Sequence, residues 1–537
     1  MAEKVVIYDT TLRDGSQGED VNFSTEDKIR VARKLDKLGV DYLEAGWPGS
    51  NPTDEKFFQE IQNYQFDHTT ITAFGSTHNP RSNPESDADL AALCNSGASA
   101  LTLFGKTWEV HVYEALRTDL EHNLKIIHDS LAFLRDKCQK LFFDAEHFFD
   151  GYKHNRDYAL ACLKQALRGG AESIILCDTN GGTLTRELRE IVEDVARELP
   201  QAHLGIHAHN DSELAVANSL AAVEAGVRQV QGTINGFGER CGNANLCSII
   251  PSLELKMGFQ CLPEEKLRDL TDTSHFVSEV ANVRPFARQP FVGRSAFAHK
   301  GGVHVSAVLK DARTYEHIEP EKVGNHQRVL LSDLSGKSNI LFKARQFGVK
   351  LEKEDPFVLD LLNQIKEMES RGYDFSVAEA SFELLLYRSL GMTRRHYQLL
   401  GFRTMDAKEK MDEDPFSEAT VRIQVGGETE HTASSGRGPV NALDNALRKG
   451  LEKFYSSIRQ MDLLDFKVRV LSPSQNGLEG TASRVRVFIE SGDSKDRWIT
   501  VGVSYNIIEA SWQALVDSVD YKLFKDERGK RAATEQQ

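Results

Sequence analysis

The stretch HLGIHAHND, residues 203–211, shows a pattern that recurs along the first half of the chain. An apolar run, Leu204 to Ile206, is followed directly by polar residues. Alternate side chains of an extended strand point to the same face, so His207 and His209 project side by side from its end. The stretch therefore predicts a buried strand whose carboxyl end bears two imidazoles.

Seven further segments of the same kind lie between residue 5 and residue 235, and helical patterns separate them. The eight predicted strands are VVIYDT (5–10), YLEAGW (42–47), TITAFG (70–75), ALTLFG (100–105), LFFDAEHF (141–148), SIILCDT (173–179), HLGIHAH (203–209) and QVQGTIN (229–235). About eight strand–helix units over roughly 250 residues match a (β/α)₈ TIM barrel.

Helix boundaries between these strands are well marked. Ser24 and Asp27 have the spacing of a capping box, and Gly39 ends the helix that they begin. A doubly wound open sheet is the structural alternative. It is disfavoured because no glycine-rich phosphate turn follows the first strand and because polar residues recur at the carboxyl ends of the strands, which share one face in a barrel.

The remainder of the chain changes pattern twice. Residues 1–260 are predicted to form the catalytic barrel, and residues 261–394 a helical linker region. Residues 395–525 combine strand and helix patterns in two related halves, which predicts a C-terminal α+β domain. Residues 526–537 are predicted to be a frayed tail.

Composition narrows the class of protein. The chain has 537 residues, of which 40% are hydrophobic and 27% charged, as in soluble globular proteins. Its formal net charge of -15 argues against nucleic acid or an anionic membrane as the main partner. Neither a signal pattern nor a membrane-spanning run is found, and the seven cysteines form no C-x-x-C pair, so a cytoplasmic protein with reduced thiols is expected.

The two strand-end histidines are candidate metal ligands. A single such histidine more often binds a backbone group, but two on one face of a barrel strand indicate a divalent-metal site. Asp14, after the first strand, is the predicted third ligand, and Asp9 is its competitor. An amide oxygen from Asn243 completes a set of nitrogen and oxygen donors that suits Mg²⁺ or Mn²⁺ as well as Zn²⁺.

Further polar residues at strand ends suit substrate binding. The Arg13 guanidinium next to Asp14 suits bidentate capture of a carboxylate. The Glu146 side chain, flanked by aromatic residues, is a candidate acid or base, and the Thr179 hydroxyl is placed to meet a substrate carboxylate. The loop GTINGFGERCGNANL (232–246) is glycine-rich as in phosphate sites, but its polar residues also suit ligation or substrate hydrogen bonds.

Four motifs occur along the chain in an order that is found in a known enzyme family: YDTTLRDGSQ (8–17), IHAHND (206–211), NGFGERCGNANL (235–246) and HKGGVHVSA (299–307). Together they resemble the α-isopropylmalate, homocitrate and citramalate synthase family, acyltransferases that condense an acyl-CoA with a 2-oxo acid. The segment GRGPVNALDNALRKGL (436–451) is similar to the effector-binding domain of many of these synthases.

Two other segments are similar to the long branch of citramalate synthases: AGWPGSNPTDEKFF (45–58) and RWITVGVSYNIIEASWQALVDSVDYKL (497–523). On that resemblance the substrates are acetyl-CoA and pyruvate, and the product enters isoleucine synthesis. The resemblance further implies a homodimer and feedback by a branched amino acid, with isoleucine the expected effector.

The resemblance also carries roles to single residues. The metal positions of the family match Asp14, His207, His209 and Asn243, and its 2-oxo-acid contacts match Arg13 and Thr179. Its barrel carboxylate matches Glu146, and two catalytic residues from the linker region match His304 and Tyr315. His304 is the expected base with Glu146 assisting, the exchanged assignment stays open, and His299 is a rival of His304.

Two positions depart from the family pattern. Ser16 stands where many isopropylmalate synthases have Glu, and Asp144 stands where an aromatic residue would close a pocket around a methyl group. Alternative functions are therefore 2-isopropylmalate synthase, which uses 2-oxoisovalerate, and an aldolase similar to the hydroxymethylglutaryl-CoA lyases. A non-catalytic effector-binding protein is a third alternative, disfavoured by the intact barrel residues.

Overall fold

The computed structural model describes residues 2–331, 335–408, 411–412, 414–471 and 483–535. The chain forms two compact units, which we treat separately. The barrel unit contains the chain up to Phe297 together with Glu316–Gln327, and the second unit contains Ala298–Tyr315 and the chain from Arg328 onward. The boundaries expected after residues 260, 394 and 525 remain predictions.

The barrel unit is built on a closed parallel barrel of eight strands, which confirms the predicted (β/α)₈ fold. Consecutive strands pair along the chain, and β1 closes the barrel by pairing with β8, Val6 opposite Gln229. The strands are β1 Val6–Asp9, β2 Tyr42–Gly46, β3 Thr70–Ser76, β4 Ala100–Lys106, β5 Lys140–Glu146, β6 Ser173–Asp178, β7 His203–Ala208 and β8 Gln229–Gly232.

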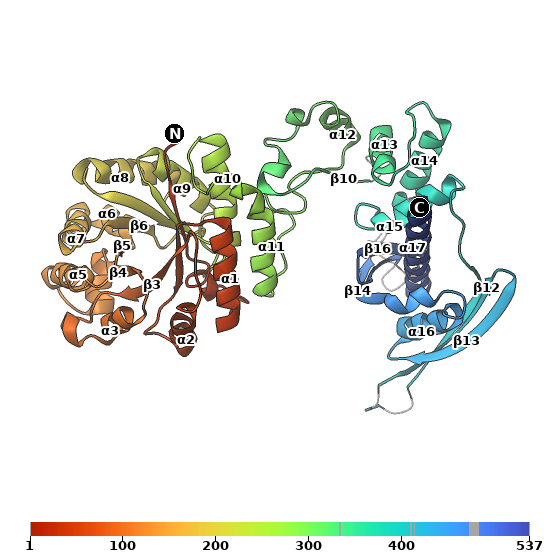
Figure 1. Ribbon diagram of the computed structural model, residues 1–537, viewed down its shortest axis with the longest axis horizontal. Coiled ribbons are helices and arrows are strands. Elements are labelled where there is room, and N and C mark those ends of the chain that lie inside the picture. The colour runs from red at the N-terminus through yellow and green to blue at the C-terminus, as the bar shows by residue number, and fades with distance from the viewer. Residues whose placement is uncertain (1, 332–334, 409–410, 413, 472–482, 536–537) are drawn as a thin grey trace. The chain divides into compact units, whose positions relative to one another are not determined.

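Helices surround these strands (Figure 1). The main ones are α1 Thr25–Leu38, α2 Pro52–Ile61, α3 Ala88–Asn95, α5 Leu120–Leu134, α6 Phe148–His154, α7 Arg156–Gly169, α8 Thr185–Glu198, α9 Ala215–Glu224, α10 Leu246–Lys256 and α11 Leu270–Val280. A short helix, α4 Glu109–His111, runs into a π-helical turn, Val112–Leu116, after β4. The apolar faces of helices and strands meet in one large core.

Helix α1 shows how local sequence sets the boundaries of these elements. The Ser24 hydroxyl accepts from the Asp27 backbone N–H while the Asp27 carboxylate accepts from the Ser24 backbone N–H, which is the predicted capping box. At the other end Gly39 adopts a φ of 91°, the left-handed conformation that glycine takes without a steric penalty. The helix thus begins and ends where its sequence predicts.

The second unit begins with short elements and helices. These are α12 Gly302–Val308, α13 Lys337–Gln346, α14 Pro356–Ser370 and α15 Glu379–Ser389, with the two-residue strands β9 Ala298–His299 and β10 Arg328–Val329 paired in parallel. A separate apolar core, which includes Ile340, Leu361 and Phe382, packs α13, α14 and α15 together. The helical character expected for this region is therefore present.

The C-terminal part consists of two successive halves, each with three antiparallel strands followed by a helix. The elements are β11 Gln398–Ala407, β12 Phe416–Val425, β13 Glu428–Gly436 and α16 Pro439–Leu451, then β14 Asp462–Val470, β15 Val485–Gly492, β16 Arg497–Ser504 and α17 Ile507–Glu535. This confirms the predicted α+β domain of two related halves.

Two details differ from the sequence prediction. The strands β11, β13 and β16 had not been singled out, and α17 continues to Glu535, so most of the segment predicted to be a frayed tail is helical. Within the residues that the structure describes, every helix is too short or too polar to cross a lipid bilayer.

Candidate active site

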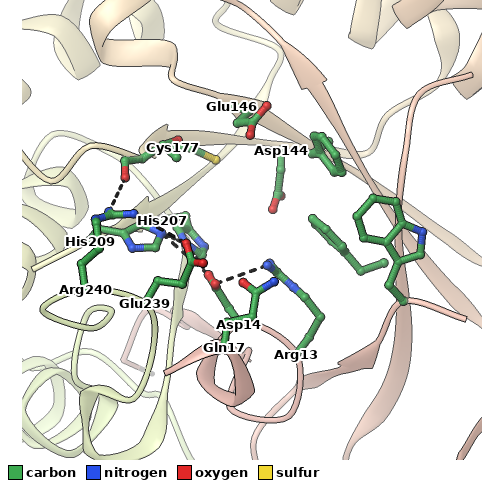
Figure 2. A pocket seen from close by; sticks show the side chains of 14 residues that line it. Arg13, Asp14, Gln17, Asp144, Glu146, Cys177, His207, His209, Glu239 and Arg240 are labelled. Carbon is green, nitrogen blue, oxygen red and sulfur yellow. Dashed lines mark hydrogen bonds and ion pairs between the residues drawn. The ribbon is translucent and has the colours of Figure 1, made fainter. Parts of the chain in front are cut away.

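A cavity of about 220 Å³ opens at the carboxyl ends of the barrel strands (Figure 2). Residues from the ends of most barrel strands and from the loops after them line it: Arg13, Asp14, Gln17, Trp47, Phe74, Phe104, Asp144, Glu146, Cys177, Thr179, His207, His209, Glu239 and Arg240. This is the face on which barrel enzymes carry their active sites. Six of the nine predicted site residues lie in this lining.

The two strand-end histidines and Asp14 converge on one point. The Asp14 Oδ2 atom lies 3.1 Å from His207 Nε2 and 3.8 Å from His209 Nε2, and the two Nε2 atoms are 3.2 Å apart. Each residue offers one ligand atom, and these three atoms lie within 4.8 Å of one another. Two imidazoles and a carboxylate in this arrangement can hold a divalent cation.

Asn243 completes this cluster from the loop after β8. Its Nδ2 atom donates to Asp14 Oδ2 at 2.8 Å and lies 3.1 Å from His207 Nε2, while its Oδ1 atom is buried without a hydrogen-bond partner among the described residues. The amide nitrogen of Asn243 thus faces Asp14 and His207, and a turn of the amide about its Cβ–Cγ bond would present the oxygen, a donor that suits a hard or borderline cation. Gly238 permits this position, because a Cβ there would lie 1.8 Å from Asn243 Oδ1.

Electrostatics favour the ligating forms of two of these groups. Burial raises the pKa of Asp14, but the Arg13 charge and the hydrogen bond from His207 outweigh it, so the pKa of Asp14 falls well below its usual range. Burial, then the nearby His207, lowers the pKa of His209 to about 4. Asp14 is therefore ionised and His209 neutral near pH 7. For His207, burial lowers the pKa, but Asp14 raises it above the ordinary value.

Arg13 is held by groups on both sides of its guanidinium. Its Nε donates to the Glu44 carboxylate at 2.6 Å, its Nη1 lies 3.4 Å from Asp14 Oδ1, and its Cζ lies 3.8 Å from the centre of the Phe74 ring. Asp9, the competitor of Asp14, is instead bonded to the Thr11 backbone and hydroxyl. Arg13 and Asp14 both line the cavity.

Thr179 lies at the end of β6 in the cavity wall. Its hydroxyl accepts from the His147 backbone N–H at 2.9 Å, which leaves the hydroxyl hydrogen to donate to a ligand. Its carbonyl accepts from Arg240 Nη2 at 2.8 Å, and Arg240 also pairs with Asp211 at 2.7 Å. Arg240 therefore connects the loops after β6, β7 and β8.

Glu146, at the end of β5, forms an ion pair with Lys106 at the end of β4. Lys106 was not a predicted site residue. The Lys106 ammonium also lies 5.2 Å from the centre of the Phe104 ring. The carboxylate that faces the cavity is thus paired with an ammonium group.

His304 and Tyr315 belong to the second unit, whereas the other seven predicted site residues belong to the barrel unit. His304 and Tyr315 contact each other: their rings stack with centroids 4.2 Å apart, within the segment that contains α12. The rival His299 lies on β9, where its carbonyl accepts from the Leu330 backbone N–H.

Aromatic residues close one side of the cavity, although not at the position expected from the family pattern. Asp144 replaces the expected aromatic residue on β5, while Phe74 and Phe104 stack with centroids 5.3 Å apart and Trp47 packs edge-on against both. The aromatic wall therefore comes from β3, β4 and the end of β2. Burial, then the Glu44 charge, raises the pKa of Asp144 to about 7.

Four contributors to the site were missed from the sequence: Glu44, Lys106, Gln231 and the aromatic wall. Glu44 had a visible signal, since it is a charged residue inside the otherwise apolar strand β2. Gln231, whose Oε1 atom lies 2.7 Å from His207 Nδ1, had a weaker signal, because Gln229 is a second glutamine in the same short strand. Lys106 had none, because a lysine after a strand is ordinarily a solvated side chain.

Three family profiles match the chain. The HMGL-like family matches residues 4–277, the homocitrate synthase post-HMGL domain-like family matches residues 291–372, and the LeuA allosteric (dimerisation) domain matches residues 376–523. Together they cover the barrel, the helical region and the two C-terminal halves in that order.

Similar proteins match over nearly the whole length. The chain is 58% identical to an (R)-citramalate synthase of Geobacter sulfurreducens, covering 97% of this chain and 98% of that protein. It is 54% identical to an (R)-citramalate synthase of Aquifex aeolicus, covering 98% and 99%. Identity to a 2-isopropylmalate synthase of a Shewanella species is 30%, covering 96% and 95%.

Proposed function

The chain belongs to the (R)-citramalate synthase family, and from that premise we propose that it is an acyltransferase that condenses acetyl-CoA with pyruvate and hydrolyses the thioester, releasing citramalate and CoA. The observation that carries the proposal is the convergence of Asp14, His207 and His209 beside Arg13 at the mouth of the barrel.

The residues that would hold the cation are Asp14, His207, His209 and Asn243. A divalent cation bound there supplies Lewis acidity that polarises the ketone of a 2-oxo acid. The donors are nitrogen and oxygen, which suits Mg²⁺, Mn²⁺ or Zn²⁺. Arg13 orients the substrate carboxylate, helped by the hydroxyl hydrogen of Thr179, and stabilises the negative charge that develops on the ketone oxygen.

We assign removal of the methyl proton of acetyl-CoA to the His304 imidazole, with Tyr315 as its stacking partner. Glu146 is the assisting group, because its carboxylate is already paired with Lys106. The carbanion equivalent formed by proton loss attacks the ketone carbon, and water then cleaves the thioester. A homodimer and feedback inhibition by isoleucine are part of the proposal, in keeping with the match to the LeuA allosteric (dimerisation) domain.

The aromatic wall supports pyruvate over larger 2-oxo acids. Trp47, Phe74 and Phe104 occupy one side of a cavity of about 220 Å³ that also contains the polar groups needed for the carboxylate and ketone. Each additional methylene group changes discrimination by about 1–3 kcal/mol, so 2-oxoisovalerate is the competitor to measure.

Release of CoA thiol from acetyl-CoA tests the proposal. The full chain is assayed with pyruvate, 2-oxobutanoate, 2-oxoisovalerate and 2-oxoglutarate under matched conditions, and pyruvate is expected to give the highest kcat/KM. His207→Ala is expected to abolish thiol release and to lower bound Mn²⁺ while the melting temperature stays near that of the wild type. Preference for 2-oxoisovalerate, or full activity and metal content in the variant, contradicts it.

A further inference from the structure

Three buried polar side chains form a continuous hydrogen-bonded row inside the barrel. His207 Nδ1 lies 2.7 Å from Gln231 Oε1, and Gln231 Nε2 donates to Asp144 Oδ1 at 3.1 Å. They come from β7, β8 and β5, and none is more than 5% exposed. We infer that Gln231 and Asp144 are positioning residues that keep the hydrogen of His207 on Nδ1 and so leave the lone pair of Nε2 for the metal site.

The direction of each hydrogen bond follows from donor and acceptor chemistry. The amide nitrogen of Gln231, which only donates, is the atom that faces Asp144, and Asp144 Oδ1 accepts its hydrogen. Gln231 must then present its oxygen to His207, and an amide oxygen only accepts. The Nδ1 atom of His207 therefore carries the hydrogen, whether the ring is neutral or protonated.

This assignment leaves the Nε2 atom of neutral His207 as the nitrogen with a lone pair. Nε2 is the atom that faces Asp14 Oδ2 at 3.1 Å and His209 Nε2 at 3.2 Å. With the amide of Gln231 reversed, its nitrogen would donate to Nδ1, and the hydrogen of the neutral ring would move to Nε2, which could then not ligate a cation. Partners of the second ring nitrogen commonly fix histidine ligands in this way.

The contact between Gln231 and Asp144 joins two strands that are not neighbours in the barrel. Gln231 pairs with His207 across the β7–β8 register, whereas Asp144 lies on β5, so the contact between Gln231 and Asp144 crosses the barrel interior. Asp144 is the residue that replaces the expected aromatic side chain. Its carboxylate thus acts on the metal ligand through Gln231.

Gln229 provides a matched control on the same strand. It lies two residues before Gln231 and hence on the same face of β8, and it is 4% exposed. Within the part of the chain that the structure describes, its Nε2 atom has no hydrogen-bond partner, so replacing its amide removes no donated bond there. Gln229→Leu and Gln231→Leu therefore make the same chemical change at neighbouring buried positions, and Gln231→Leu alone removes the acceptor of His207.

The test measures binding of Mn²⁺ by the full chain. Equilibrium dialysis separates free from bound Mn²⁺, and electron paramagnetic resonance reads the free ion. Gln231→Leu is expected to weaken Mn²⁺ binding by about 10–100-fold, the range for loss of a partner behind a metal ligand. Gln229→Leu is expected to keep Mn²⁺ binding within about twofold of the wild type, because it touches no ligand. Equal losses in both variants overturn the inference.

A second, independent test moves the carboxylate from position 144 to position 231, next to His207. Gln231→Glu places an acceptor directly on His207 Nδ1 but sets two carboxyl groups against each other in a buried site, which is unfavourable. The double variant Gln231→Glu/Asp144→Asn removes that repulsion and is expected to restore Mn²⁺ binding to within about threefold of the wild type. If Gln231→Leu does not fold, the double variant decides: folded protein that fails to bind Mn²⁺ overturns the inference.

The inference rests on the proposed metal site. The variant His207→Ala distinguishes a failure of the metal site from a failure of the positioning role. Retention of Mn²⁺ by His207→Ala contradicts the metal site itself. Loss of Mn²⁺ in His207→Ala together with wild-type binding in folded Gln231→Leu overturns only the positioning role and leaves the proposed function standing. Melting temperatures of all variants report folding separately from Mn²⁺ binding.

Discussion

Arg13 stacks on the Phe74 ring and pairs with the carboxylates of Glu44 and Asp14, so its planar fork is fixed before any substrate arrives. A lysine at this position keeps the charge but cannot form the fork or the stack. We expect Arg13→Lys to lower kcat/KM for pyruvate by roughly 10²–10³-fold, the range for loss of one donor to a developing oxyanion.

Steady-state kinetics with Mn²⁺ binding measured in parallel checks this expectation. Mn²⁺ binding should change little, since Arg13 is not among the proposed ligands. A threefold change in kcat/KM corresponds to a free energy of about 0.7 kcal/mol. A kcat/KM of Arg13→Lys within threefold of the wild type would therefore show that a positive charge alone is sufficient at this position.

Lys106 is expected to act through Glu146. Replacing the ammonium by a thioether of similar length, in Lys106→Met, frees the Glu146 carboxylate to move, and we expect kcat to fall by roughly tenfold. That is less than the 10²–10⁴-fold contribution typical of an acid–base group itself. The measurement compares kcat and KM of Lys106→Met with those of Lys106→Arg, which restores a cation; equal kcat in Lys106→Met and the wild type contradicts the role.

At the residue scale, the sequence predicted those site residues whose positions follow from the alternation of side chains along a strand and from the order of the barrel strands. His207 and His209 share a face because the strand period is two, and Asp14 follows the first strand of the same barrel. Lys106 could not be foreseen, because its role depends on the neighbouring strand β5 placing Glu146 beside it. Pairing across strands is a property of the folded barrel.

At the scale of elements, alternation of apolar residues predicted β12, β14 and β15, whereas β13, with the sequence ETEHTASSG, has almost no apolar residue. It is a strand because it pairs antiparallel with β12 over its whole length, Ser417 opposite Gly436 to Val425 opposite Glu428. Tertiary pairing overrides weak local preference in such a strand. The extension of α17 to Glu535 has the same kind of cause, since the Arg528 side chain pairs with Glu383 on α15.

The segment that leads into β11 is tied to α17 by a charged hydrogen bond. His396 Nδ1 bonds to the Asp520 carboxylate, and His396 Nε2 lies 3.3 Å from Glu527 Oε1. Burial lowers the pKa of His396, but the hydrogen bond to Asp520 and the negative charges of Asp520 and Glu527 raise it above its ordinary value of 6.5. The protonated ring therefore stabilises the folded state below pH 6.5, and this stabilisation is lost as pH rises through the raised pKa.

Replacement by glutamine, His396→Gln, tests that sign. The variant is expected to be less stable than the wild type at pH 6, by about 1–3 kcal/mol, as for a lost hydrogen bond to a buried charged group. The deficit should shrink as pH rises through the raised pKa of His396, where the wild-type ring loses its proton. Differential scanning calorimetry at several pH values measures it, and a deficit that grows with pH contradicts the assignment.

At the scale of the whole molecule, the match of residues 376–523 to the LeuA allosteric (dimerisation) domain bears on assembly. We expect light scattering behind a sizing column to give twice the chain mass of 60.1 kDa. Added isoleucine should lower the rate of thiol release without competing with pyruvate, while alanine at the same concentration leaves the rate unchanged. A monomer that isoleucine does not inhibit contradicts both parts of the proposal.

The course of the chain between the two units has a mechanical consequence. The polypeptide leaves the barrel unit after Phe297, returns to it for Glu316–Gln327, and leaves again at Arg328. The segment that carries His304 and Tyr315 is therefore joined to the barrel unit at both of its ends, which limits the volume that it can explore. A protease cut inside that segment would leave both pieces still anchored, so nicked protein should travel as one particle through a sizing column.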